Sequence, residues 1–83
     1  MDFEIGKWYI DQEGDFIRVT SYSPNYVNSD AHLFKSRGYC FVVTAHESPR
    51  NKYQFRLATG EEIIKYLPES EWQLINSELF PIF

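Results

Sequence analysis

The chain has 83 residues, of which 43% are hydrophobic and 24% are charged, and its formal net charge is −4. This length gives one domain, residues 1–83, with a single modest core, and the composition excludes a disordered tail. No apolar stretch approaches the ~20 residues that cross a bilayer, and residues 1–5 do not read as a secretory leader. One cysteine cannot form an internal disulfide, so we expect a cytoplasmic protein.

The first two β-prone segments predict a hairpin. Residues 7–10 are aromatic and β-branched, residues 11–15 form a polar turn that contains Gly14, and residues 16–22 are again β-prone. Two such segments around a short glycine-containing turn are typical of a β-hairpin.

The longest polar stretch follows, over residues 23–30. Asn, Ser and Asp favour turns here, because their side chains compete with the backbone for hydrogen bonds. Ser29 or Asp30 would cap one helical turn over residues 31–34. A loop this long in a small domain is usually functional or mobile, so it is the first candidate for a binding surface.

Three more strands are expected. In residues 39–46, the side chains that would face either side of a strand are mostly apolar, which predicts a central strand. Residues 47–51 are predicted to form a turn around Pro49. Residues 52–58 alternate cleanly and pair with the preceding strand, and residues 63–67 read as a fifth strand.

The last segment changes to a helical period. Ser70 and Gln73 have the spacing of a capping box, and Trp72, Ile75 and Leu79 share one helical face before Pro81. The predicted fold is therefore mainly β: a small, five-stranded, strongly bent antiparallel sheet or partly open barrel with one short C-terminal helix.

The opening residues carry a family resemblance. Residues 5–10, Ile-Gly-Lys-Trp-Tyr-Ile, followed by Phe-Ile-Arg-Val at 16–19, resemble the start of small SH3-like barrel proteins of the phage and mobile-element type. The resemblance covers about the first quarter of the chain. It implies a binding module without chemistry of its own, and suggests a stoichiometric inhibitor of a host defence enzyme that acts by surface contact or by partial mimicry of nucleic acid.

Charge is segregated along the chain. Residues 1–15 carry a net charge of −4, residues 35–56 carry +4, and residues 57–83 carry −4. If the fold gathers the acidic segments, they form a face that attracts a basic partner; otherwise they are ordinary solubilising charges.

The reactive residues are few. Cys40 and His46 would lie about 20 Å apart on an extended strand, and neither they nor His32 has metal-ligand spacing. Cys40 is expected to be a small buried hydrophobe. The carboxylates of Asp11, Glu13 and Asp15 crowd one turn but lack a complete calcium loop. The sequence therefore predicts no enzyme, no cofactor and no metal.

Binding to another protein is the favoured function. With 18% aromatic residues, some rings are expected at the surface, and the partner-binding candidates are three rings and an acidic turn: Tyr22, Tyr26, Phe34, Asp11, Glu13 and Asp15.

Two alternatives remain open. The first is nucleic-acid binding by the basic aromatic segment 35–56, through Lys35, Arg37, Arg50, Lys52 and Arg56. The second is a structural homodimer joined through the apolar residues Phe80, Ile82 and Phe83.

Overall fold

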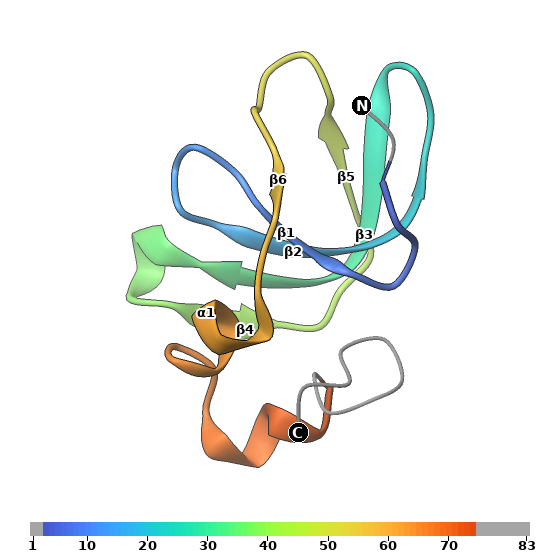
Figure 1. Ribbon diagram of the computed structural model, residues 1–83. Helices are drawn as coiled ribbons and strands as arrows, with labels where there is room; N and C mark the ends of the chain where they lie inside the picture. Colours follow the sequence, from blue (N-terminus) through green and yellow to red (C-terminus); the bar gives the residue numbers. More distant parts are fainter. Residues whose placement is uncertain (1–2, 75–83) are drawn as a thin grey trace.

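The computed structural model describes residues 3–74 and is mainly β (Figure 1). It contains a six-stranded antiparallel sheet that is not closed into a barrel. The prediction of a mainly β fold with an antiparallel sheet is therefore confirmed, whereas the predicted number of strands, five, and the SH3-like barrel are wrong. Along the sheet the order is β4-β3-β2-β1-β6, and β5 pairs with β3. The strands are β1 (Trp8–Ile10), β2 (Phe16–Tyr22), β3 (Tyr26–Phe34), β4 (Cys40–Val42), β5 (His46–Pro49) and β6 (Arg56–Leu57).

The predicted N-terminal hairpin is confirmed. β1 and β2 pair in antiparallel register, with Ile10 opposite Phe16. The carboxylate of Asp11 organises the turn, because its Oδ1 accepts hydrogen bonds from the backbone N–H groups of Glu13, at 2.8 Å, and Asp15, at 3.1 Å. Gly14 has a φ of 88° there, a left-handed conformation that glycine adopts without strain.

The predicted loop over residues 23–30 and the helical turn after it are wrong. The turn is short: the backbone N–H of Ser23 donates to the carbonyl of Tyr26 at 2.8 Å, and Ser23 Oγ accepts from the N–H of Tyr26 at 3.1 Å. The chain then continues as β3 to Phe34. Val27 and Leu33 are buried against the sheet, and this burial outweighs the turn preference of the polar residues between them.

Bulges interrupt the register between β2 and β3. Arg18 pairs with Ala31 but Val19 pairs with Ser29, so Asp30 is the extra residue on β3. Asp30 accepts a 2.6 Å hydrogen bond from Arg18 Nε at this point. A bulge shifts the alternation of side chains by one residue, and Ser29 and His32 therefore share one face of the sheet although they are three apart.

The segment predicted as one central strand is divided. β4 lies at an edge of the sheet, residues 43–45 leave the sheet, and β5 returns to pair with the other end of β3. Cys40 is exposed on this edge strand, so its predicted burial is wrong. The predicted turn over 47–51 is displaced, since the chain turns only after Pro49. The next strand, β6, pairs with β1 and not with residues 39–46.

Residues 63–67 do not form the predicted fifth strand. The structure has helix α1 (Gly60–Ile64), which begins with a capping box. Thr59 Oγ1 accepts from the N–H of Glu62 at 3.2 Å, and Glu62 Oε1 accepts from the N–H of Thr59 at 3.0 Å. The spacing Thr-x-x-Glu explains the helix, because it satisfies two backbone donors at the helix start.

A 3₁₀ helix over Glu69–Leu74 stands where an α-helix was expected from Ser70. Figure 1 shows it and α1 at the β4 end of the molecule. The remaining residues of the predicted helix, Ile75 and Leu79, lie outside the described residues. None of the helices within residues 3–74 has the length and hydropathy needed to cross a bilayer.

Replacing Thr59 with Ala is expected to lower the free energy of unfolding by about 1 kcal/mol, because the N–H of Glu62 loses its side-chain acceptor. Urea unfolding followed by circular dichroism measures this change. Thr59→Ser keeps the acceptor and should stay close to the wild type. Equal losses in both variants would show that the threonine methyl group, and not the cap, stabilises this turn.

The sheet is apolar on both faces. On the first face, the buried residues are Trp8, Phe16, Ala31, Leu33, Ala58, Ile63 and Leu67, two of them contributed by α1 and the residues after it. On the second face, they are Phe3, Tyr9, Ile17, Val19 and Val27, with Phe55 packed against them. Successive side chains of β1 and β2 point to opposite faces of the sheet, as strand geometry requires, so each strand contributes to both cores. The second face carries the candidate site.

Candidate functional site: an aromatic groove on the second face

A row of aromatic rings crosses the second face of the sheet. Phe3 lies at its centre, with ring centroids 5.6 Å from Tyr22 and 5.7 Å from Phe55, and Tyr53 follows at 5.9 Å from Phe55. The Arg50 guanidinium carbon lies 5.2 Å from the ring centre of Phe3 and 5.6 Å from that of Tyr22. We call these five residues and the hollow beside them the aromatic groove.

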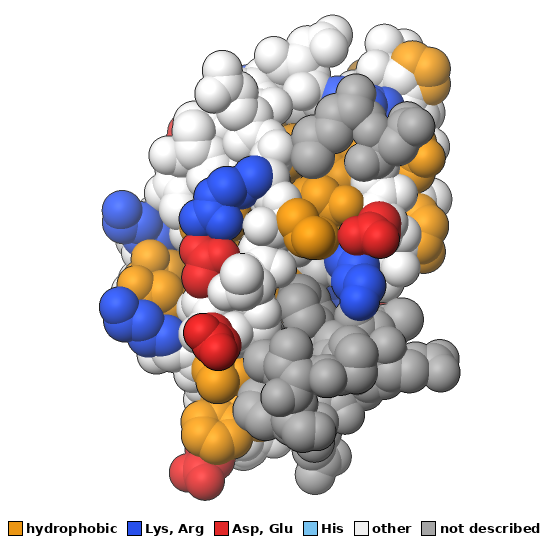
Figure 2. All heavy atoms as spheres, viewed as in Figure 1, with side chains coloured by type: hydrophobic (Ala, Val, Ile, Leu, Met, Phe, Trp, Pro, Cys, Tyr) orange, Lys and Arg blue, Asp and Glu red, His pale blue; other side chains and the backbone are white. Residues whose placement is uncertain are grey.

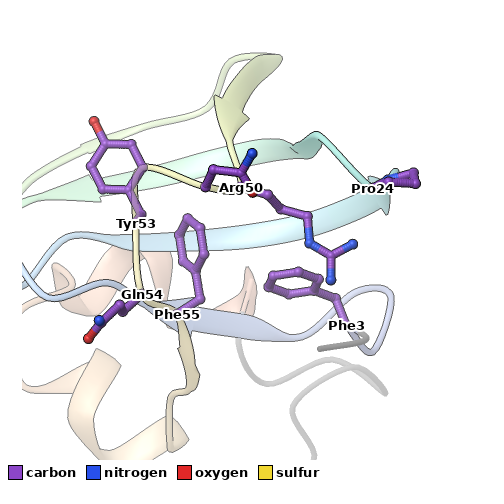
Figure 3. Close-up of a pocket in the computed structure, with 7 residues that line it drawn as sticks. Phe3, Pro24, Arg50, Tyr53, Gln54 and Phe55 are labelled. Carbon is purple, nitrogen blue, oxygen red and sulfur yellow. The ribbon is translucent and has the colours of Figure 1, made fainter.

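The hollow has a volume of about 590 Å³. In Figure 3 the ring of Phe55 stands between those of Tyr53 and Phe3, and the side chain of Arg50 reaches over Phe3. Its walls combine rings with amides and one guanidinium, a composition common in binding sites. It is lined by Phe3, Pro24, Arg50, Asn51, Tyr53, Gln54 and Phe55.

Two sets of hydrogen bonds hold the groove walls in place. Gln12 bridges the segment before β6, because its Oε1 accepts from the N–H of Gln54 at 2.7 Å and its Nε2 donates to the carbonyl of Lys52 at 3.3 Å. Arg50 is fixed to the β2–β3 turn: Nη1 donates to the carbonyl of Ser23 at 2.8 Å, and its N–H donates to that of Asn25 at 2.9 Å. The groove is therefore preformed.

The three predicted partner-binding rings do not form one surface. Tyr22 is 38% exposed and belongs to the aromatic groove, where its ring lies beside that of Phe3. Tyr26 is 44% exposed, but it precedes Val27 on β3 and so faces the other side of the sheet. Phe34 is half-buried at the far end of β3, about 26 Å along the strand from Tyr26. Strand β3, in place of the predicted loop, separates them.

The acidic turn lies at the Phe34 end of the sheet. The carboxylates of Asp11, Glu13 and Asp15 are within 4.8 Å of one another, and Asp15 Oδ1 accepts from the backbone N–H of Lys35 at 2.8 Å. Burial raises the pKa of Asp11, and the neighbouring carboxylates of Asp15 and Glu13 add to this effect. Backbone hydrogen bonds to Asp11 oppose the shift.

The five basic candidates are distributed over the molecule. Arg37 lies over the ring of Phe34 at 5.5 Å, and Lys52 lies over that of Tyr53 at the same distance. Arg56 pairs with Glu62 through two hydrogen bonds of 3.0 and 2.7 Å, which lower the pKa of that glutamate to about 2.

Arg50 and Lys52 thus reach the aromatic groove, and Lys35 is exposed beside the acidic turn. The proposed dimer residues Phe80, Ile82 and Phe83 lie outside the described residues.

Sequence reasoning missed most of the groove. Phe3, Tyr53 and Phe55 are not among the residues that the sequence predicts to bind a partner. The alternation of 53 and 55 was the available signal, and both side chains do point toward the same face, where they remain half-buried.

Comparison of the chain with protein-family models, with curated proteins and with solved structures gave no match.

Proposed function

We propose that the protein acts by binding another protein, and that the aromatic groove is its contact surface. The observation that carries this proposal is the preformed hollow of about 590 Å³, which is lined by three aromatic rings and one guanidinium, with the ring of Tyr22 beside that of Phe3. Tyr and Arg are enriched among residues that dominate binding energy, since they bring large, rigid contact area at low entropic cost. The hydrogen bonds that Gln12 accepts from Gln54 and that Ser23 accepts from Arg50 reduce the ordering cost on binding.

The proposal includes no catalytic step. A stoichiometric inhibitor of another protein, the role suggested by the resemblance of the first strands, requires only such a contact surface. Mimicry of nucleic acid would require a continuous run of carboxylates. On the face shown in Figure 2, acidic and basic side chains of the described residues alternate, which favours recognition through the groove over mimicry by charge.

Alanine at Tyr22 or Tyr53 is expected to weaken capture of the partner by about tenfold or more, as for other central interface rings. The immobilised chain and each variant would be incubated with native extract, and bound proteins quantified by mass spectrometry. Leu57→Ala and Val43→Ser remove exposed apolar groups outside the groove and are the matched controls. An unchanged set of bound proteins in both groove variants would contradict the proposal.

Binding of single-stranded nucleic acid is the second candidate, because Arg50 and Lys52 each lie against a ring of the groove. Its affinity for an oligonucleotide would fall steeply with salt, and Lys52→Gln would reduce the salt slope by about one. The net charge of −4 opposes attraction to phosphates, which is why protein binding ranks first. Salt-independent or undetectable oligonucleotide binding would remove this candidate.

A further inference from the structure

His32 is a buried histidine with an unpaired nitrogen. His32 is 3% exposed, and its Nε2 lies 3.4 Å from Ser29 Oγ. Within residues 3–74, Nδ1 is one of two buried side-chain nitrogens without a hydrogen-bond partner, the other being Nε1 of Trp8. Buried polar groups are nearly always paired, so a water molecule or an ion is expected to bind this nitrogen unless the group is strained.

The surroundings of His32 keep it neutral. Its ring stacks on Phe34 at 4.9 Å and meets His46 edge-on at 4.6 Å. Burial, followed by the nearby His46, lowers the pKa of His32 to about 4, while the carboxylate of Asp15 acts in the opposite direction. The imidazole rings of His32 and His46 are therefore direct neighbours.

A small cavity brings this histidine together with the acidic turn. It has a volume of about 60 Å³, and four of its lining residues are Asp11, Asp15, His32 and His46. Ile17, Phe34, Ser48, Tyr53 and Phe55 complete the lining. This volume accommodates an ion together with a water molecule.

We propose that this cavity binds a divalent transition-metal ion of the zinc type, through carboxylate oxygens of Asp11 and Asp15 and imidazole nitrogens of His32 and His46. Two nitrogen and two oxygen donors around a small cavity suit such an ion, whereas calcium prefers six to eight oxygens. The carboxylates of Asp11 and Asp15 already lie within 4.8 Å of each other, and the side chains of His32 and His46 line the same cavity. The site does not depend on the proposed protein contact.

Titration of the full chain, purified without a polyhistidine tag, with Zn²⁺ and with Co²⁺ tests the site. Binding is expected at one ion per chain, with the visible absorption of four-coordinate Co²⁺. His46→Gln and Asp15→Asn should each weaken Zn²⁺ binding by about tenfold or more. His46 is exposed and Asp15 half-buried, so both variants should fold, which far-ultraviolet circular dichroism checks.

Two neighbouring carboxylates provide controls. Glu47→Gln and Glu13→Gln change exposed groups beside His46 and in the acidic turn, and neither residue lines the cavity. Both should bind Zn²⁺ as the wild type does. Three results would overturn the proposal: no binding of Zn²⁺, equal binding by all variants, or a preference for Ca²⁺ that survives His46→Gln and is lost in Glu13→Gln.

Discussion

Replacing Phe16 with Ala should lower the free energy of unfolding by about 3–5 kcal/mol. Phe16 is 1% exposed in the first core, with its ring 6.5 Å from Tyr39 and 6.3 Å from Tyr66. Truncation removes the transfer free energy of the ring and leaves a cavity between β2 and the residues after α1. Because a small domain is stable by only about 5 kcal/mol or somewhat more, this variant should retain only a small part of its free energy of unfolding.

Urea unfolding followed by tryptophan fluorescence and circular dichroism measures this loss. Leu57→Ala is the matched control, since Leu57 is 47% exposed and its truncation should change stability little. Equal stability of the two variants would show that Phe16 does not lie in a packed core, and would contradict the assignment of the first face of the sheet.

Acidification should destabilise the fold through His32. Its pKa is about 6.5 when unfolded and is lowered to about 4 in the folded protein. Below pH 6.5 the His32 imidazole binds a proton in the unfolded chain but not in the folded protein. The free energy of unfolding therefore falls as the pH drops from 6.5 toward 4. The full shift corresponds to roughly 3 kcal/mol. His46 and Asp15 are the groups that face this imidazole and act on its pKa, in opposite directions.

Urea unfolding over this pH range tests the assignment to His32. In His32→Asn, the free energy of unfolding should change little with pH above pH 4. In His46→Gln, it should fall less steeply on acidification, because removing a neighbouring positive charge lets the pKa of His32 rise. Glu62 contributes in a separate window: its stabilisation is present above its unfolded pKa of 4.5 and is lost toward pH 2. A wild-type profile that stays flat between pH 6.5 and 4 would contradict the burial of His32.

The first hairpin was predictable because its signals are local. Trp8 and Tyr9 alternate between two buried faces, and Gly14 marks the turn between the strands. Strand β3 was not predictable, because the bulge at Asp30 breaks the period-two pattern and its polar residues favour a turn when considered alone. Residues 26–34 form a strand because they pair with β2 on one side and with β4 and β5 on the other.

The error at α1 has a different origin. Ile63 and Ile64 resemble a β-strand by composition, but the helix is started by Thr59 and Glu62, a capping box that the sequence does contain. The local signal was present and was outweighed by the apparent β propensity of two isoleucines.

The candidate site depends on contacts that a sequence pattern does not contain. Phe3 joins the groove through Arg50, and the segment of Tyr53 and Phe55 is held by the side chain of Gln12. These residues are far apart along the chain, and only the order of strands in the sheet places them together. The same holds for Asp15 and His32, whose spacing in sequence gives no metal signal.

Photo-cross-linking tests most directly whether the protein acts by contact through the aromatic groove. A photoreactive phenylalanine analogue would be incorporated in place of Tyr22 or Tyr53, and for comparison in place of Val43 or Leu57, in cells that naturally produce the chain. Both groove positions are predicted to form covalent adducts with the same protein, which the two comparison positions do not capture. Adducts formed only at the comparison positions, or only with nucleic acid, would contradict protein recognition through the groove.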